Sequence, residues 1–580
     1  MSGSSPSRAY QTCTVHSQAE MEHHREPESD EKLPGSQPYA SSLLHETEHD
    51  TIEERKTPPK TLSFYLAFLA LCIIVFIVSI DATALSVALP RIALDLHGTT
   101  LESFWASLSF LLAVAITQPL YNSISDVVGR LIPLYASFVF FFIGCVVFAV
   151  GQSMSVVITG RVLQGLGAGG LDVLSDVILA DITTLKERPL YIGLFAIPMA
   201  LGSILGPLLG ALLSQGPGWR WIGWINLPIA GAGFILAVFF LRLKPIEKTL
   251  DQKLKSLDWI GLGLFALGST IFTLPLSWAG SIYSWSSWRT LLPLLLGLLI
   301  LIVLGFYERK PKEAVFPYRI FRNATAFVTL IGSFIHGAVL YSAILYLPLF
   351  FQAVNLETTL QSAISFLPLA ASVVFFSVMG AGAVETLRKY RWSIVGSWVL
   401  SALGTGLWAL FDNNSGKGLR AGLQMIAGAG LGVLFTVQFV PMQASCERTD
   451  DHGLAVGILT SFRLLGALIG ISLCSTVFNS VFSSSIRELG DLPTGLEPLK
   501  DVKEAIGMIP LLRTIEMDPG TKLSLIDSYR TALMAIFLML TGFSVLGLAT
   551  SVFTQDLSLE TEELGRQSMR ASEKSGGDVA

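Results

Sequence analysis

The sequence predicts an all-α polytopic membrane protein. From residue 64 to residue 553 it consists almost entirely of apolar runs of about 20 residues, separated by short charged or Gly/Pro-rich breaks. An α-helix of about 20 residues is long enough to cross the hydrocarbon core of a bilayer. Of the 580 residues, 51% are hydrophobic and only 14% are charged. A soluble core cannot bury that much apolar surface, so the composition excludes a soluble multidomain enzyme.

Fourteen apolar runs have the length of a membrane-spanning helix. They cover approximately residues 64–89, 103–122, 131–150, 155–180, 190–213, 221–241, 258–278, 290–307, 324–351, 360–383, 392–411, 419–444, 455–480 and 529–553. Residues 1–60 are rich in Ser, Glu, His and Pro. Such a segment cannot offset the entropy of ordering and is expected to be a disordered tail.

The distribution of Lys and Arg predicts the orientation. If the N-terminus is cytoplasmic, most loop cations fall on the cytoplasmic side. The opposite short loops hold only Arg91, Arg220, Arg289, Lys417 and Arg420. Both chain ends are therefore expected in the cytoplasm. The segment 483–528 would then lie outside, either as a flexible loop or as a partly ordered cap.

Two acidic–basic pairs indicate two related halves. Asp126 precedes Arg130 by four residues after the second span, and Glu385 precedes Lys389 by four residues after the tenth. This spacing places both charges on one helical face, although chance would also produce it. Two six-helix bundles flanking an inserted helix pair would explain the repeat. The expected divisions are a cytoplasmic tail (1–60), the first bundle (61–245), the inserted pair with its linker (246–312), the second bundle (313–555) and a second cytoplasmic tail (556–580).

The first predicted cytoplasmic turn contains Asp126, Gly129 and Arg130. These residues match the Gly-x-Leu-Ala-Asp-Arg-x-Gly-Arg-Lys loop of the major facilitator superfamily, which the chain therefore resembles. In that family the loop is a cytoplasmic gate whose acid engages basic groups and a helix end of the opposite half. A carboxylate beside an Arg can form and break such a contact, although an ordinary capped turn uses the same residues. The sequence departs from the pattern at Asn122, Val127 and Leu131, which removes two cations and predicts a weaker lock.

The fourth span places Arg161, Gly165, Asp172 and Asp176 within one helical face. An unpaired charge at membrane depth costs about 2.5–3.5 kcal/mol, so a cation and two acids on one span predict a functional strip facing the bundle interior. The resemblance places Arg161, Gln164 and Gly165 in the family's Arg-Val-x-Gln-Gly pattern, which is associated with proton transfer. The alternative is that these charges only fix helix packing.

Asp81 lies in the first span, in a stretch that resembles the Leu-Asp-x-Thr-Ile-Val-Asn-Val-Ala-Leu-Pro segment of fourteen-span drug:proton antiporters. Asp81 and Thr83 match the pattern, whereas Ser86 replaces the Asn. A carboxylic acid buried at this depth can bind and release a proton as access alternates. Asp81 is thus the first candidate proton carrier, and Asp176 is the second. A hydrogen bond between Asp81 and neighbouring backbone is the alternative.

The fifth span carries Gly202, Gly206 and Gly210 at spacings of four residues, together with Pro207. These glycines form a bare helical stripe suited to close packing, and the proline permits a bend. The stretch resembles the Gly-x-x-x-Gly-Pro-x-x-Gly pattern of the antiporter branch, which implies export rather than uptake.

The second half offers candidates for a substrate cavity: Tyr346, Phe350, Gln352 and Gln438. Aromatic and amide side chains can line an apolar cavity, although such residues more often serve helix packing. Asn413 begins a glycosylation sequon in a predicted external loop.

The sequence shows no Walker loop, no His-Glu-x-x-His and no Cys-x-x-Cys, so we expect no enzymatic activity and no cofactor. No basic stripe indicates nucleic acid. The resemblance implies a monomeric, proton-coupled exporter of toxins, drugs or secondary metabolites, with a small-molecule substrate, protons and membrane lipid as its partners. The plasma membrane is the expected location, with the vacuole as the alternative. Two other functions stay open: proton-coupled transport of a defined solute, such as a siderophore or basic amino acid, and a non-transporting membrane sensor.

Overall fold

The computed structural model describes residues 60–98, 100–185, 187–244, 251–252, 255, 257–279, 283–311, 315–413, 415–448, 451–489, 505, 508–509, 511–513 and 518–559. The predicted N-terminal tail and most of the predicted C-terminal tail lie outside the described residues. The helices belong to one compact unit that begins at Lys60.

Long α-helices account for nearly all of the described chain. The first six are α1 (Leu62–Asp95), α2 (Thr100–Val128), α3 (Leu131–Ala149), α4 (Met154–Ile182), α5 (Arg188–Gln215) and α6 (Trp221–Phe240). A pair follows, α8 (Trp259–Trp278) and α9 (Trp288–Tyr307). The remainder are α10 (Ala324–Ala353), α11 (Thr359–Leu387), α12 (Arg391–Leu407), α13 (Lys417–Val437), α14 (Phe439–Ala444), α15 (His452–Glu488) and α16 (Pro519–Ser551). With α13 and α14 counted as one span, 14 helical segments are long and apolar enough to cross a membrane, which confirms the prediction.

Several helices begin at residues whose side chains cap the free backbone N–H groups of the first turn. Ser153 accepts a hydrogen bond from the first turn of α4, and Asp258 accepts one from the first turn of α8. Thr358 and Gln361 form a capping box at the start of α11. These caps satisfy donors that would otherwise be unpaired where an apolar span begins.

The helices pack as two bundles with the same internal pattern. In the first bundle α1 packs against α5 and α6, α2 against α4, and α3 against α4 and α6. In the second bundle α10 packs against α15 and α16, α11 against α13, and α12 against α13 and α16. The pattern repeats helix by helix, as in the fold predicted from the sequence. The exact residue divisions between the bundles stay a prediction.

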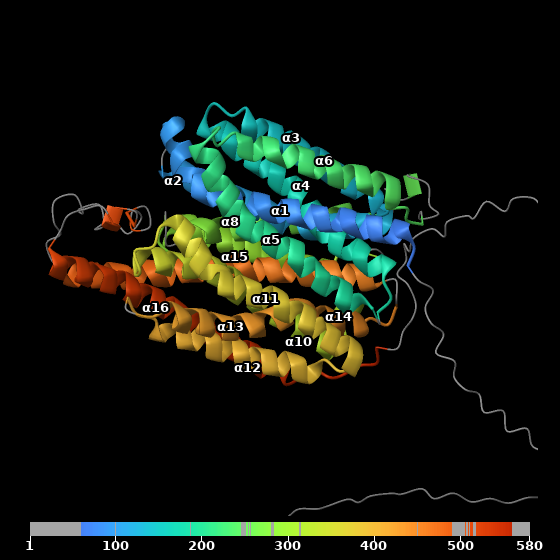
Figure 1. Ribbon diagram of the computed structural model, residues 1–580. Coiled ribbons are helices and arrows are strands. Elements are labelled where there is room, and N and C mark those ends of the chain that lie inside the picture. The colour runs from blue at the N-terminus through green and yellow to red at the C-terminus, as the bar shows by residue number, and fades with distance from the viewer. Residues whose placement is uncertain are drawn as a thin grey trace, which may run out of the picture. The chain divides into compact units, whose positions relative to one another are not determined.

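The two bundles contact each other through α2 and α4 against α15, and through α5 against α11. Figure 1 shows α5 beside α11 at the centre of the helical unit. Leu174 and Val177 of α4 share a buried apolar cluster with Phe439, Leu454 and Leu459 of the second bundle. These residues lie in the halves of their helices predicted to be cytoplasmic, so the bundles are in contact at that end.

The inserted helices α8 and α9 form a hairpin that contacts both bundles. They pack against each other, and α8 also packs against α2 and α15. Val127 and Val128 at the end of α2 join Leu257, Leu262 and Val315 in a small apolar cluster. The hairpin is therefore attached beside the turn that carries the predicted gate.

Two acids lie at the predicted cytoplasmic end of this hairpin. The Tyr307 hydroxyl donates to Asp258 Oδ1 over 3.0 Å, and the backbone N–H of Phe316 donates to Glu308 Oε2 over 3.3 Å. Burial raises the pKa of Glu308 from 4.5 to about 7, and the charge of Asp258 adds to the increase, whereas the hydrogen bonds from Phe316 and Val315 oppose it. Glu308 is therefore a group that titrates near neutral pH.

The outer ends of α15 and α16 correct the expected loop boundaries. The segment 483–528 was expected to be a flexible loop or a partly ordered cap between spans 455–480 and 529–553, but α15 continues to Glu488 and α16 begins at Pro519. Figure 1 shows the first turns of α16 extending beyond the other helix ends. The described residues between them include Ala505, Ile509 and Leu512, which are buried against this extension. The Tyr529 hydroxyl donates to the carbonyl of Ala505 over 2.6 Å. The apolar side chains of the segment explain the difference, because they cover the extended helices.

We predict that Glu308 makes the stability of the protein depend on pH. Since the folded pKa lies above the ordinary value, this contribution is fully present below about pH 4.5 and is lost as the pH rises through about 7. The melting temperature of the purified protein in detergent should therefore fall between about pH 5 and pH 8. Glu308→Gln should remove that part of the fall, whereas Asp251→Asn, an exposed control, should keep it. A wild-type profile for Glu308→Gln would assign the fall to other groups.

Candidate functional site

The centre of the first bundle holds a closed polar network around Asp81. Arg161 Nη1 donates to Asp81 Oδ2 over 2.8 Å, and Arg161 Nη2 donates to the Asp81 carbonyl over 3.3 Å. Gln164 Nε2 and Asn226 Nδ2 donate to Asp81 Oδ1 over 3.1 and 2.6 Å. Gln164 also contacts Cys145 Sγ and accepts from Arg161. Residues of α4 and α6 thus converge on one carboxylate of α1, and α3 joins the network through Gln164.

This network is dry and balanced in charge. Asp81 and Arg161 are 1% and 2% exposed, and the guanidinium lies 4.2 Å from the ring centroid of Phe110. An isolated charge at this depth would be costly, so each ion requires the other. Asp81 is bonded to side chains of two other helices, α4 and α6, rather than to neighbouring backbone alone. The role of Asp81 in proton transfer stays a prediction.

The glycine stripe of α5 packs directly on the stretch of α1 that carries Asp81. A side chain at Gly202 would meet Ser79, one at Gly206 would meet Thr83, and one at Gly210 would meet the carbonyl of Ala84. The absence of side chains at these positions allows the two backbones to approach closely. A displacement of α1 around Asp81 would therefore require α5 to move as well.

Asp172 and Asp176 lie at the interface between the bundles and are only half-buried. Gln118 Nε2 of α2 donates to Asp172 Oδ2 over 2.8 Å, and Thr460 of α15 donates to Asp176 Oδ2 over 3.2 Å. Arg463 of α15 interacts electrostatically with both acids. The sequence predicted that Arg161, Asp172 and Asp176 form one strip. The structure separates them, because Arg161 faces Asp81 inside the first bundle whereas the two acids lie at the interface between the bundles.

The predicted gate residues meet at the end of α2. Gly129 has φ +107°, a conformation that favours glycine, and this turn brings Arg130 back over the helix end. Arg130 donates from Nη2 to Asp126 Oδ1 over 3.3 Å and from Nε to Asp181 Oδ2 over 2.9 Å. Gly453 at the start of α15 lies against this cluster. The first turn of α15, in the second bundle, therefore lies against the buried ion pairs.

Asn122, which departs from the glycine of the family pattern, adds a contact between the bundles. Its Nδ2 donates to the carbonyl of Leu454 on α15 over 3.1 Å, and Gly457 leaves room for its amide. A second link is formed by Arg188, whose Nη1 donates to Gln443 Oε1 over 2.8 Å. Neutral hydrogen bonds and buried arginines thus join the bundles at the end where this sequence lacks two cations of the family pattern.

The repeat is seen in the backbone of the second half. Arg388 has φ +55° and corresponds to Gly129 in its spacing from the acid, Glu385. Lys389, the counterpart of Arg130, is exposed, whereas Arg130 is buried. The two positions therefore differ in burial.

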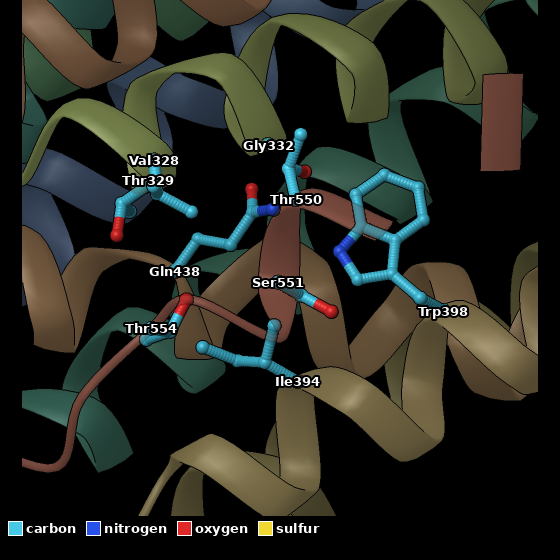
Figure 2. Close-up of a pocket in the computed structure, with 9 residues that line it drawn as sticks. All are labelled: Val328, Thr329, Gly332, Ile394, Trp398, Gln438, Thr550, Ser551 and Thr554. Atoms are coloured by element: carbon cyan, nitrogen blue, oxygen red, sulfur yellow. The ribbon is translucent and has the colours of Figure 1, made fainter. Parts of the chain in front are cut away.

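The cavity candidates lie within the second bundle. Tyr346 and Phe350 are buried in its apolar core, and the Phe350 ring lies 5.7 Å from that of Phe537. Gln352 donates to Ser362 over 3.0 Å. Figure 2 shows Gln438 pointing into a small, mostly apolar pocket, which is lined by Val328, Thr329, Gly332, Ile394, Trp398, Gln438, Thr550, Ser551 and Thr554. A role of these candidates in substrate binding stays a prediction.

Comparison with known proteins identifies the family. Residues 71–471 match the sequence profile of the Major Facilitator Superfamily. The chain belongs to the Major Facilitator Superfamily. It is 48% identical over 515 residues to the MFS-type transporter sphD of Aspergillus fumigatus, covering 88% of this chain and 89% of that protein. It is 30% identical over 535 residues to the MFS-type efflux pump LUC4 of a Fusarium species, covering 92% and 94%.

A solved structure of the superfamily has the same fold. The proton:xylose symporter XylE aligns with a TM-score of 0.54 at 13% identity, covering 86% of this chain and 98% of that one. At this identity the likeness concerns the fold alone. The sequence relatives support a role of this Major Facilitator Superfamily member in membrane transport and efflux, and they confirm that the chain is a transporter rather than an enzyme.

The sequence analysis missed several partners in these clusters. Asn226 and Cys145 complete the Asp81 network, Gln118 bonds Asp172, and Asp181 holds Arg130. Amides and acids inside apolar runs were a usable signal for Asn226 and Asp181. Their pairing could not be predicted, because it depends on how helices distant in sequence are rotated.

We predict that Gly206→Leu disrupts the contact between α1 and α5. The new side chain meets Thr83 and backbone of α1, and such overpacking typically costs about 1–3 kcal/mol or more. The melting temperature and the yield of monodisperse protein should fall. Gly263→Leu in α8, where the added atom meets no neighbour within 4 Å, is the matched control. Equal behaviour of the two variants would contradict close packing at the stripe.

We also predict that Gly457→Val weakens the contact between the bundles, because its side chain would occupy the space of the Asn122 amide. The native Cys446 lies near Arg188 and reports on this end of the interface. Its alkylation by a thiol reagent in membranes, measured by mass spectrometry, should become faster. Gly231→Val in α6 meets open space and should leave the rate unchanged. An unchanged rate for Gly457→Val would show that this contact does not hold the interface closed.

Proposed function

We propose that this chain exports small, largely apolar compounds in exchange for protons. The observation that carries the proposal is the dry network in which Asp81 balances Arg161. A carboxylate can exchange a proton, and here its charge state decides whether Arg161 has a counter-ion. The name of the relative LUC4, an efflux pump, supports export as the direction.

The proposed cycle couples this charge state to access. A proton from the outside neutralises Asp81, which weakens its bonds to Arg161, Gln164 and Asn226. The α1 segment around Asp81 then shifts on the glycine stripe of α5, and α5 in turn contacts α11 of the opposite bundle. Substrate leaves to the outside in this step, and the proton leaves to the cytoplasm when access reverses. Asp172 and Asp176 are the second candidates for the proton carrier.

The same proposal includes a gate, a membrane location and a glycosylation site. The cytoplasmic ends of α2 and α15 act as the gate, with Asp126, Gly129 and Arg130 on one side. We place the protein in the plasma membrane as a monomer. Asn413, which is exposed, is proposed to carry a glycan on the outer side.

Asp81→Asn tests the proposal. The amide preserves the shape of the side chain but cannot exchange the proton, so proton-coupled export should be abolished in reconstituted vesicles. The assay measures the pH change inside vesicles loaded with a pH-sensitive dye when rhodamine 6G is added. Asp95→Asn, the same change in an exposed residue of α1, should leave coupling unchanged. Retained coupling in Asp81→Asn, with wild-type folding by size-exclusion chromatography, would move the proton role to Asp172 or Asp176 or refute it.

A further inference from the structure

Three charged side chains at the bundle interface have more hydrogen-bonding capacity than the protein uses. Asp172 accepts one hydrogen bond, from Gln118, and Asp176 accepts one, from Thr460. An ionised carboxylate can accept about four. Arg463 Nη2 donates to the Phe435 carbonyl over 2.9 Å, whereas its buried Nε has no partner. In the described part of the chain no ion pair joins Arg463 to either acid, although the three interact electrostatically.

The contrast with Asp81 concerns the two acids, because Arg161 in that network likewise has a buried Nε without a partner. Asp81 accepts from Arg161, Gln164 and Asn226, so its carboxylate is nearly saturated by the protein. Asp172 and Asp176 are half-buried and nearly free to accept from another molecule. Buried or half-buried ions persist without partners only at a free-energy cost, which a ligand with complementary charges would relieve.

The position of these groups fits a ligand that both bundles must hold. Asp172 and Asp176 lie one turn apart on α4 of the first bundle, in the half of the helix predicted to be cytoplasmic, and Arg463 lies on α15 of the second. The Arg463 guanidinium lies 4.5 Å and 4.9 Å from the ring centroids of Phe435 and Phe439. Charged groups thus lie beside aromatic surface, which suits a molecule with a charged end and an apolar body.

We propose that Asp172, Asp176 and Arg463 bind the polar end of an amphiphilic substrate that carries a protonated amine next to a carboxylate or similar anionic group. The amine donates to the two acids, and the anionic group accepts from Arg463. The three side chains together carry a net charge of one negative unit when both acids are ionised, so an amine without an anionic group binds less well but is accepted. This inference rests on the proposed transport function and specifies its substrate class.

The test measures binding to the full-length protein in lipid nanodiscs at fixed pH and without a gradient. Four radiolabelled probes share one alkyl chain length: 2-aminododecanoic acid, dodecylamine, dodecanoic acid and 1-dodecanol. Empty nanodiscs correct for partition into lipid. Charge-assisted hydrogen bonds should make 2-aminododecanoic acid bind at least about tenfold more tightly than 1-dodecanol, with dodecylamine between them. Equal affinities for the four probes would overturn the proposal.

Variants assign the contacts to individual residues. Arg463→Gln should reduce the affinity for 2-aminododecanoic acid about tenfold, and it should not weaken that for dodecylamine, because it removes a cation beside the two acids. Asp172→Asn and Asp176→Asn should each reduce the affinity for both amines, and Asp95→Asn should change neither. The conservative variant Arg463→Lys should restore part of the loss. Loss of affinity for 1-dodecanol as well would indicate a general folding defect, which contradicts direct contact with the polar end.

This experiment fails independently of the proposed proton exchange. If Asp81→Asn abolishes coupling but the four probes bind equally, only the substrate class is wrong. If the probes differ as expected but Asp81→Asn keeps coupling, only the role of Asp81 in proton exchange is wrong.

Discussion

The ion pair between Asp81 and Arg161 is the constraint around which the first bundle is arranged. Removing one partner of a buried pair typically costs about 3–5 kcal/mol, because the other charge is left without compensation. Three further helices must therefore keep their rotation relative to α1, so that Cys145, Gln164 and Asn226 reach the same place. Glycines make this arrangement possible, since Gly144 of α3 and Gly165 of α4 lie against the backbones of neighbouring helices.

The charged residues of the membrane-spanning helices fall into two classes with different consequences. The Asp81 carboxylate is nearly saturated by hydrogen bonds from side chains of its own bundle. In the proposed cycle these hydrogen bonds change when Asp81 binds a proton. The acids at Asp172 and Asp176 are unsaturated and face the other bundle, so their surroundings change whenever the bundles move apart. This separation would allow Asp81 to respond to protons, and Asp172 and Asp176 to respond to the charge of a bound molecule.

Much of the fold was predictable because its causes are local, whereas the site depended on tertiary geometry. Fourteen apolar runs and their caps identify the helices, and the Asp126–Gly129–Arg130 turn depends on a local backbone conformation at Gly129. The partners of Asp81 and Arg130 come from distant helices, and no pattern specifies which faces will meet. The outer extension of α15 was missed for another reason. The apolar side chains of this extension are covered by residues around Ile509. The helix therefore continues past the end of the apolar run by which the span was predicted.

The inserted hairpin limits how the bundles can move. Because α8 packs on both α2 and α15, it spans the pair of helices that meet at the predicted gate. Any separation of these two helices must either break the contact of α8 with one of them or carry the hairpin along. The Ser472 hydroxyl of α15 donates to the Leu276 carbonyl of α8 over 2.7 Å, whereas the contact with α2 near the gate is the apolar cluster around Val127 and Val128. Apolar contacts are non-directional and can slide, but a hydrogen bond to a buried carbonyl is lost when it is displaced. The hairpin should therefore move with α15, and the surface between α8 and α2 is where sliding would occur.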